Sequence, residues 1–380
     1  MDFGLSDDQE AFRATAAAFA RDAMAPHAER WDADRIFPED TLRAAAALGF
    51  AGLYVADDVG GSGLGRVDAA VVLEELAAAC PSTAAYLSIH NMVAWMIDRF
   101  GSGAQRLRWL PELCRMDGFA SYCLTEPGAG SDAASLATRA RRDGDHYVLD
   151  GQKAFISGGG RSEVYLCMVR TGDAGSAGIS ALVVEAGTPG LSFGAQEHKM
   201  GWNSQPTAAV NFDGCRVPIG QRLGEEGDGF KIAMAGLDGG RVNIAACSLG
   251  GARAAMEAAG LHTTERRQFG QPLAAFQATQ FKLADMATEL TAARMMVHRA
   301  AAKLDDGAVD RTVAAAMAKR FATDVGFRVA NEALQLFGGY GYIRDCGIER
   351  IVRDLRVHQI LEGTNEIMRL IIARDLIGGR

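Results

Sequence analysis

The chain has 380 residues, of which 48% are hydrophobic and 23% charged, which predicts a globular protein of about two to three domains. The net charge is −8 and no basic tract is interleaved with aromatic residues, which argues against a nucleic-acid partner. Seven scattered cysteines without a C-x-x-C pair indicate reduced thiols, and abundant alanine with more arginine than lysine suggests a bacterial, cytoplasmic protein.

Residues 1–119 have a helical pattern. The opening MDFGLSDDQEAF is acidic and lacks an apolar core, so it is neither a signal peptide nor a transit peptide. Apolar residues recur at helical spacing after Ser6, a plausible N-cap, and segment 67–101 reads as two helices broken at Pro81. Charges interrupt each apolar stretch well short of the ~18 residues of a membrane span. We therefore expect an N-terminal helical domain over residues 1–119.

The residue pattern changes from helical to β-type after Phe119. Short β-type runs separated by Gly, Asp and Pro continue to about Leu223. Asp-Gly pairs at 143–144 and 150–151 flank one such run and are hairpin turn signals. Connections of hairpin length favour an antiparallel sheet or barrel over parallel β-α-β units. The sequence therefore predicts a middle β-domain over residues 120–223.

Long amphipathic segments follow Gly229 and continue to the end of the chain. The two longest span residues 276–304 and 309–339, and their length suits an antiparallel helical bundle. The C-terminal domain is expected over residues 224–380. The fold class is therefore α+β, with helices, then a β-domain, then helices.

The sequence gives little support to a dinucleotide-binding site, a metal site or a serine hydrolase. GGSGLG at 60–65 lacks the G-x-G-x-x-G spacing and the alternating β-α context of a dinucleotide fold, so an ordinary loop is favoured. His358 and Glu362 are four residues apart and could share a helix face, but no third ligand lies nearby, which disfavours a metal site. No G-x-S-x-G supports a serine hydrolase.

Several stretches have more specific content. YCLTEPGAGSD at 122–132 exposes backbone N–H groups that suit a ligand, although a structural turn explains it equally well. Arginines and glycines near expected helix ends suit phosphates, although each alone is more often a surface charge or a cap. These occur in GLDGGRVNIA, ERRQFGQPLAAFQ and LQLFGGYGY. In HQILEGTNEI, Glu362 follows an apolar pair. Burying a carboxylate there is costly, so we expect it to have a charged or hydrogen-bonded partner or a functional role.

Together YCLTEPGAGSD, KAFISGGG, ERRQFGQPL, QLFGGYGY and ILEGTNEI resemble the acyl-CoA dehydrogenase family, in the same order over essentially the whole chain. The resemblance implies an N-terminal helical domain, a middle antiparallel β-barrel and a C-terminal four-helix bundle. It also implies a homotetramer with one FAD per subunit, an acyl-CoA substrate and an electron-transfer flavoprotein as electron acceptor.

The resemblance also assigns binding residues. The residues expected to border the flavin ring or the nearby FAD are Tyr122, Cys123, Leu124, Thr125, Phe155, Ile156, Ser157, Thr364, Asn365 and Glu366. Arg266 is expected at the FAD pyrophosphate with Phe276 and Gln277 close by, and the adenosine end of the neighbour's FAD takes Gln335, Leu336, Phe337, Gly338 and Gly339. These two sets should then serve opposite sides of a subunit boundary. The acyl-CoA thioester should be bordered by Ser131, Asp238, Gly239, Gly240, Arg241 and Arg374.

The resemblance gives Glu362 the role of catalytic base, which removes the α-proton while the β-carbon gives hydride to flavin N5. Burial raises the pKa of a carboxyl group and makes it a better base. Some relatives carry the base at the position of Gly240, where this chain has none. The likeness is strongest to members that act on isobutyryl-CoA, which implies methacrylyl-CoA as product and a place in valine breakdown. Glutaryl-CoA enzymes carry an arginine at about Leu87, so leucine there argues against dicarboxylyl substrates.

Three alternatives stay open from the sequence. The chain could prefer butyryl-CoA or 2-methylbutyryl-CoA, could act on an acyl chain bound to a carrier protein, or could be a flavin- and CoA-binding relative without activity. The presence of Glu362 favours an enzyme over the last of these, because relatives that have lost activity tend to lose the base.

Overall fold

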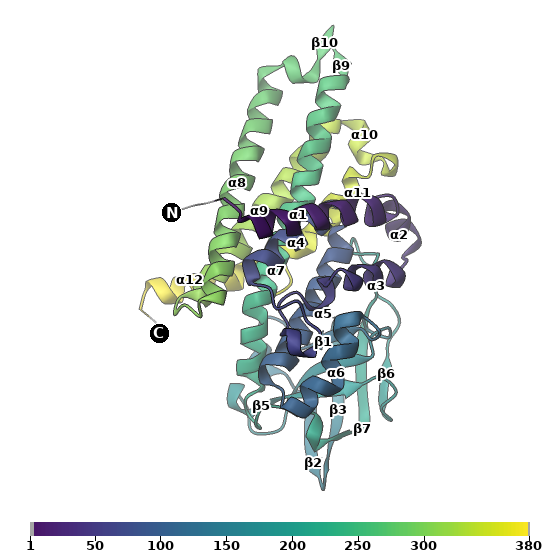
Figure 1. The fold of residues 1–380 in the computed structure, drawn as a ribbon, viewed down its shortest axis with the longest axis vertical. Helices are drawn as coiled ribbons and strands as arrows, with labels where there is room; N and C mark the ends of the chain where they lie inside the picture. Colours follow the sequence, from purple (N-terminus) through teal and green to yellow (C-terminus); the bar gives the residue numbers. More distant parts are fainter. Residues whose placement is uncertain (1–3, 379–380) are drawn as a thin grey trace.

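The structure, a computed structural model, describes residues 4–378 and joins two helical parts to one sheet (Figure 1). The predicted N-cap is confirmed, because Ser6 Oγ accepts a hydrogen bond from Gln9 N at 3.2 Å and Gln9 Oε1 accepts one from Ser6 N at 3.1 Å. Pro81 begins its helix, where a missing N–H costs nothing. The N-terminal α-helices are α1 (Asp7–Phe19), α2 (Ala28–Asp34), α3 (Glu39–Ala47), α4 (Arg66–Ala79), α5 (Pro81–Phe100) and α6 (Gly103–Arg115).

The middle part is one eight-stranded sheet with the pairing order β6-β7-β3-β2-β4-β5-β8, to which β1 adds beside β4. Its strands are β1 (Ala120–Cys123), β2 (Arg139–Asp143), β3 (His146–Ser157), β4 (Val164–Arg170), β5 (Ile179–Glu185), β6 (Leu191–Phe193), β7 (Thr207–Pro218) and β8 (Arg222–Leu223). Pairing is antiparallel, as the sequence predicts, except where β1 and β2 run parallel to β4.

The two Asp-Gly pairs have different outcomes. Gly144, with φ +62°, lies in the tight turn between β2 and β3, which confirms that hairpin. Gly151 lies inside β3, where the register to β7 shifts, so the predicted turn there is wrong and the feature is a bulge. A Cβ at position 151 would stand 2.7 Å from Thr138 Cα, so the glycine permits a close approach of β3 to the segment just before β2.

Strand β4 connects the core of the sheet domain to the core formed with the helices. Its alternate residues face two different cores. Val164, Leu166 and Met168 pack with residues of α5, α6 and α7, whereas Tyr165 and Cys167 pack within the sheet domain. Because both faces are buried, the strand reads as a continuous apolar run rather than an alternating one.

The C-terminal part is built on three long helices, of which the second runs antiparallel to the first and third, with α12 packed along α9. Helix α7 alone is about 55 Å long at 1.5 Å per residue, and it runs from the sheet to the β9–β10 hairpin (Figure 1). The elements are α7 (Gly229–Glu265), β9 (Arg267–Gln268), β10 (Gln271–Pro272), α8 (Gln277–Asp305), α9 (Arg311–Phe337), α10 (Gly339–Tyr342), α11 (Ile348–Arg356) and α12 (Asn365–Leu376). We retain the division at residues 119/120 and 223/224 as a proposal.

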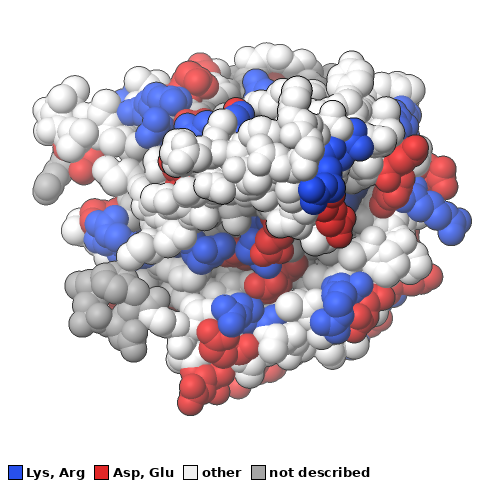
Figure 2. All heavy atoms as spheres, turned by 90° about the horizontal axis from the view of Figure 1, so that it is seen from above, with Lys and Arg blue, Asp and Glu red and all other residues white. Residues whose placement is uncertain are grey.

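The surface carries both signs of charge. Figure 2 shows Lys and Arg atoms interspersed with Asp and Glu on the face seen from above, with broad uncharged areas between them. Within residues 4–378, no helix is both long and apolar enough to cross a membrane.

Candidate active site

Glu362 lies in the tight turn between a 3₁₀ helix, Val357–Gln359, and α12. Its φ is +57° and that of Gly363 is +86°, so both residues adopt the left-handed conformation. A residue with a Cβ is strained in this conformation, and such strain is concentrated at functional sites. Thr364 then caps α12, because its Oγ1 accepts a hydrogen bond from Ile367 N at 3.3 Å.

The carboxylate of Glu362 is left free by its surroundings. Its Oε2 is buried and accepts no hydrogen bond from any residue that the structure describes. A Cβ on Gly240 would lie 2.4 Å from this oxygen and 2.9 Å from Met92 Sδ, so the glycine makes room for the carboxylate. Burial raises the pKa of Glu362 from 4.5 to about 7, against the opposing charges of Arg241 and Lys319. The group can therefore take up a proton near neutral pH.

Arg241 supports the turn from α7. Its Nε donates to the carbonyl oxygen of Glu362 at 3.2 Å, and its Nη1 donates to Asp238 Oδ1 at 2.7 Å. Thr312 Oγ1 donates to the other oxygen of Asp238 at 2.6 Å. Both charged side chains are buried, and the helix begins twelve residues earlier, at Gly229. The suggestion that Arg241 is a phosphate ligand near a helix end is therefore wrong, because its guanidinium holds the turn.

A buried histidine braces the other side of the turn. Trp202 Nε1 donates to His358 Nε2 at 3.2 Å, and His358 Nδ1 lies 2.7 Å from Ser248 Oγ. Because Nε2 accepts, the proton of the neutral ring is placed on Nδ1. Burial lowers the pKa of His358 to about 3, so the ring stays neutral. His358 thus serves packing, and residues 4–378 contain no group of three potential metal ligands.

An apolar cluster faces the turn from α5 and α7. Its buried members are Ala85, Ile89, Trp202 and Ile244, with Tyr122, Val357 and Leu361 packed on them. The hydroxyl of Tyr122 is buried and finds no hydrogen-bond partner among the described residues. Burial raises the pKa of Tyr122, and the charge of Glu362 adds to the effect, so this neutral donor lies near the base.

Leu87 does not belong to this cluster. It packs in the large core beneath α1 and α4, on the face of α5 opposite to Ala85 and Ile89. A helix turns by 100° per residue, so positions 85, 89 and 92 share one face and position 87 does not. The interpretation of Leu87 as a substrate determinant is therefore wrong.

The ends of β1 and β3 are tied together beside Tyr122. Lys153 Nζ donates to Glu126 Oε1 at 2.7 Å and to Leu124 O at 3.2 Å, and this ion pair is buried. Glu126 also accepts from the backbone N–H groups of residues 137 and 138, at 2.6 and 3.0 Å. The Glu of the TEPGAGSD stretch is thus structural.

Phe155, next to this pair, has φ +58° and a side chain that is 67% exposed. It lies where the register between β3 and β7 shifts, so the bulge turns the ring outward from the strand. Ser157 ends the strand, and its carbonyl accepts a hydrogen bond from Ser121 Oγ at 2.6 Å. The stretches predicted for the flavin ring, 122–125 and 155–157, are therefore brought together.

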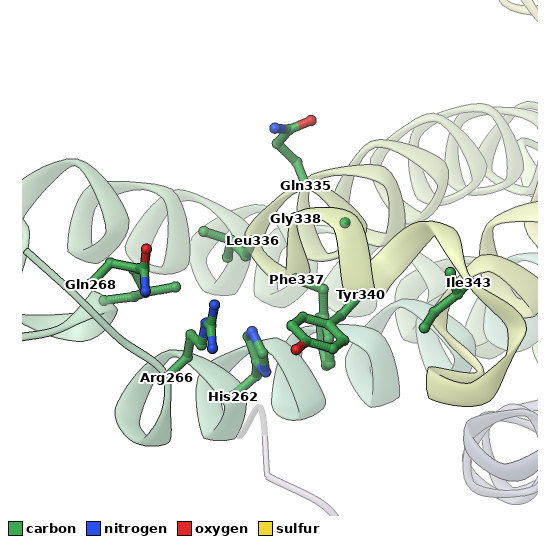
Figure 3. Close-up of a pocket in the computed structure, with 11 residues that line it drawn as sticks. His262, Arg266, Gln268, Gln335, Leu336, Phe337, Gly338, Tyr340 and Ile343 are labelled. Carbon is green, nitrogen blue, oxygen red and sulfur yellow. The ribbon is translucent and has the colours of Figure 1, made fainter.

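A hollow of about 530 Å³ lies at the C-terminal end of α7 (Figure 3). Arg266 points into it, with its guanidinium 5.5 Å from the ring centroid of Tyr340. His262 stacks on Phe337 with centroids 4.3 Å apart. The predicted stretch Gln335–Gly339 lines the same hollow as Arg266. A guanidinium, two glycines and aromatic rings suit a phosphate-linked nucleotide.

This placement corrects the expectation that Arg266 and Gln335–Gly339 serve opposite sides of a subunit boundary. Both line one wall of one chain. Arg266 is about 40 Å along α7 from Gly240, and hence far from Glu362. The residues predicted for the FAD pyrophosphate and adenosine are thus far along α7 from the residues around Glu362.

The remaining predicted residues are scattered. Phe276 is half-buried and Gln277 exposed at the start of α8. Asn365 is buried and bonded to α9, whereas Glu366 is exposed on α12. Ser131, after β1, and Arg374, in the last turn of α12, are exposed on separate elements. The structure therefore gathers the α7 residues at Glu362 but leaves Ser131 and Arg374 at the surface.

Two residues near the base were missed from the sequence. Met92 is apolar and gave no signal beyond helix periodicity. Lys319 is fully buried, and it could have been found, because it falls on the inward face of its helix with Ala315 and Ala322. A lysine at a core position needs a reason.

Comparisons with known proteins identify the family of the chain. Three family models match in order: the acyl-CoA dehydrogenase N-terminal domain over residues 6–117, the middle domain over 121–215 and the C-terminal domain over 227–377. The isobutyryl-CoA dehydrogenases, mitochondrial, of Dictyostelium discoideum and Bos taurus are 58% and 57% identical over 374 residues, which cover 98% of this chain and 90% of each relative.

A solved structure shows the same fold. Butyryl-CoA dehydrogenase from Megasphaera elsdenii superposes with a TM-score of 0.96 at 40% identity, covering 99% of this chain and 100% of that chain. The two mitochondrial relatives give no support to a bacterial origin, which stays a prediction from composition.

Proposed function

The chain belongs to the acyl-CoA dehydrogenase family, and on that premise we propose that it oxidises isobutyryl-CoA to methacrylyl-CoA. The observation that carries the proposal is the buried, unpartnered Oε2 of Glu362 beside Gly240, among residues 4–378. An acceptor without a donor, held on a strained turn, is suited to a substrate proton. The 58% identity to an isobutyryl-CoA dehydrogenase directs the choice of acyl chain.

The chain's own residues supply the proton chemistry. Glu362 takes the proton from the α-carbon of the thioester, which is a weak acid, so a desolvated base is needed. Its pKa of about 7 is close to the working pH, which favours proton transfer. Ile89, Ile244 and Leu361 keep water from the reacting carbon. A bound FAD would supply the acceptor for the hydride that leaves the β-carbon.

The residues present fit FAD in two places. The ends of β1 and β3 suit the flavin ring, and the hollow at Arg266 suits the pyrophosphate and adenosine. Because these places are far apart along α7, we propose that Arg266 and Gln335–Gly339 hold a FAD whose flavin ring lies in a neighbouring subunit. A FAD shared in this way requires at least two subunits, and the exposed Phe269 and Tyr342 beside the hollow support a covered surface there. The family resemblance extends this proposal to a homotetramer.

Substrate size is limited by the side chains around the base. Ile89 and Met92 are buried close to the site, and we propose that these side chains limit the length of the acyl chain. One methylene in an apolar pocket is worth about 1–3 kcal/mol, or roughly 10–200-fold. Butyryl-CoA and 2-methylbutyryl-CoA should therefore react detectably, and straight chains of eight or more carbons poorly. We further propose an electron-transfer flavoprotein as the acceptor.

Anaerobic bleaching of the flavin over a panel of acyl-CoA esters tests the proposal. We expect isobutyryl-CoA to bleach the flavin fastest and to give the highest kcat/KM in turnover with an artificial dye acceptor. A higher value for octanoyl-CoA or isovaleryl-CoA would overturn the choice of substrate but not the family. Failure of every ester to bleach the flavin would instead favour a non-catalytic relative.

A further inference from the structure

The turn that carries Glu362 is held by two buried cations. Arg241 binds the carbonyl of Glu362, and Lys319 Nζ donates to the next carbonyl, that of Gly363, at 2.8 Å. Lys319 comes from α9 and therefore approaches the turn from a different helix than Arg241. Two successive carbonyls held by two different helices leave the turn little freedom to relax.

The surroundings of Lys319 do not explain a charge. Its second acceptor is Asn365 Oδ1 at 3.0 Å, so both of its bonded partners are uncharged oxygens. Asn365 in turn donates to Asp324 Oδ1 at 2.7 Å and to Thr323 Oγ1 at 2.9 Å, which fastens α12 to α9. A neutral donor could make the same bonds without the cost of burying an ammonium group.

The charge has a nearby counterpart in the base. Burial lowers the pKa of Lys319 to about 7, and the carboxylate of Glu362 is the strongest influence raising it. The groups that face Lys319 from the elements packed around it are Glu362 of the turn, Arg241 of α7, Asp324 of α9, Glu366 of α12 and His358 of the 3₁₀ helix. His358 is neutral, and Glu366 is exposed, so solvent screens its charge.

We propose that Lys319 is a positioning residue for the dehydrogenation: it fixes the base-bearing turn through the carbonyl of Gly363, and its ammonium group favours the ionised form of the Glu362 carboxylate. The inference rests on the proposed function. Without the ammonium group, burial of Glu362 is opposed by Arg241 alone, so a smaller fraction of the base is ready to accept a proton. An opposite charge nearby typically lowers the pKa of a carboxyl group by about 1–3 units.

The test compares Lys319→Met and Lys319→Gln with the wild-type holoenzyme across pH. Because Glu362 acts as the carboxylate, kcat/KM rises with pH through its pKa. We expect this acidic limb to move upward by on the order of one pH unit in both variants. The glutamine variant should keep more of the maximal rate, because an amide can still donate to the Gly363 carbonyl. Lys231→Met, which removes an exposed lysine of α7, should match the wild type.

FAD content and the unfolding midpoint are measured on the same samples, since a purely structural lysine would change these and leave the pH limb in place. An unmoved limb in folded, FAD-loaded variants overturns the proposal. If the methionine variant does not fold, the limb of the glutamine variant decides. Wild-type protein that fails to turn over isobutyryl-CoA would count against the proposed function and not against Lys319, whose effect is read on any ester that reacts.

Discussion

Replacing Glu362 by glutamine should abolish turnover and stabilise the protein at the same time. The amide cannot accept the α-proton, so nearly all activity should be lost while FAD and acyl-CoA still bind. The second effect comes from burial. A rise in pKa from 4.5 to about 7 means that the folded state holds the proton more tightly than the unfolded state.

The size and sign of this effect follow from linkage. A shift of this size corresponds to about 3 kcal/mol at 1.36 kcal/mol per pKa unit. Below pH 4.5 the carboxyl group is protonated in both states and costs nothing. As pH rises from 4.5 to 7, the wild type loses stability, because the folded state must give up a proton that it holds more tightly. Glutamine does not ionise, so its advantage should grow to about 3 kcal/mol above pH 7.

Denaturant unfolding of both holoenzymes at pH 5 and pH 8 measures this difference. The variant should be only slightly more stable at pH 5 and clearly more stable at pH 8. Glu112→Gln, at an exposed position of α6, is the matched control and should show no such growth with pH. Equal stability of wild type and Glu362→Gln at pH 8 would refute the view that the base is held in a desolvated place. Substantial activity with a dye acceptor would refute its role as base.

Three further outcomes are expected. Gly240→Ala should lower kcat by about 100-fold with FAD retained, because its Cβ would displace the Glu362 carboxylate; an unchanged kcat would show that the carboxylate does not work from this position. Arg266→Ala should lower FAD occupancy in absorbance spectra, whereas Arg267→Ala should not, and equal occupancy in both would remove the pyrophosphate role. Met92→Ala should raise kcat/KM for longer acyl chains relative to isobutyryl-CoA, and an unchanged ratio would show that Met92 does not limit length.

The sequence predicted the features that depend only on residues close together in the chain. The cap at Ser6, the break at Pro81 and the long helices α8 and α9 follow from side-chain chemistry and periodicity within a few residues. The prediction at Gly151 is wrong because a turn and a bulge both need glycine, and only the pairing of β3 with β7 distinguishes them. Family resemblance pointed to Glu362, but not to its environment.

The residues whose positions were wrongly predicted depend on contacts between segments that are far apart in the sequence. Arg266 and the Gln335–Gly339 stretch are about 70 residues apart in sequence and meet only because α7 and α9 pack side by side in the same direction, which brings their C-terminal ends together. The substrate role predicted for Leu87 is wrong because Leu87 lies on the face of α5 opposite to Ala85 and Ile89. Lys319 could have been singled out by periodicity, yet its carbonyl acceptor lies 44 residues later, and no pattern in the sequence joins them.

The features that make Glu362 useful are ones that a folded chain tends to avoid. A left-handed backbone at a non-glycine residue costs about 1–3 kcal/mol, and a buried carboxylate without a donor adds to this cost. A turn without support would relax, by moving the carboxylate toward a donor or toward water. Arg241, Lys319 and the Trp202–His358 pair prevent this from three directions, and none of them binds the carboxylate oxygens. The base is thus kept reactive by fixing its backbone rather than its side chain, so substitutions that satisfy the free oxygen should stabilise the fold and slow the reaction together.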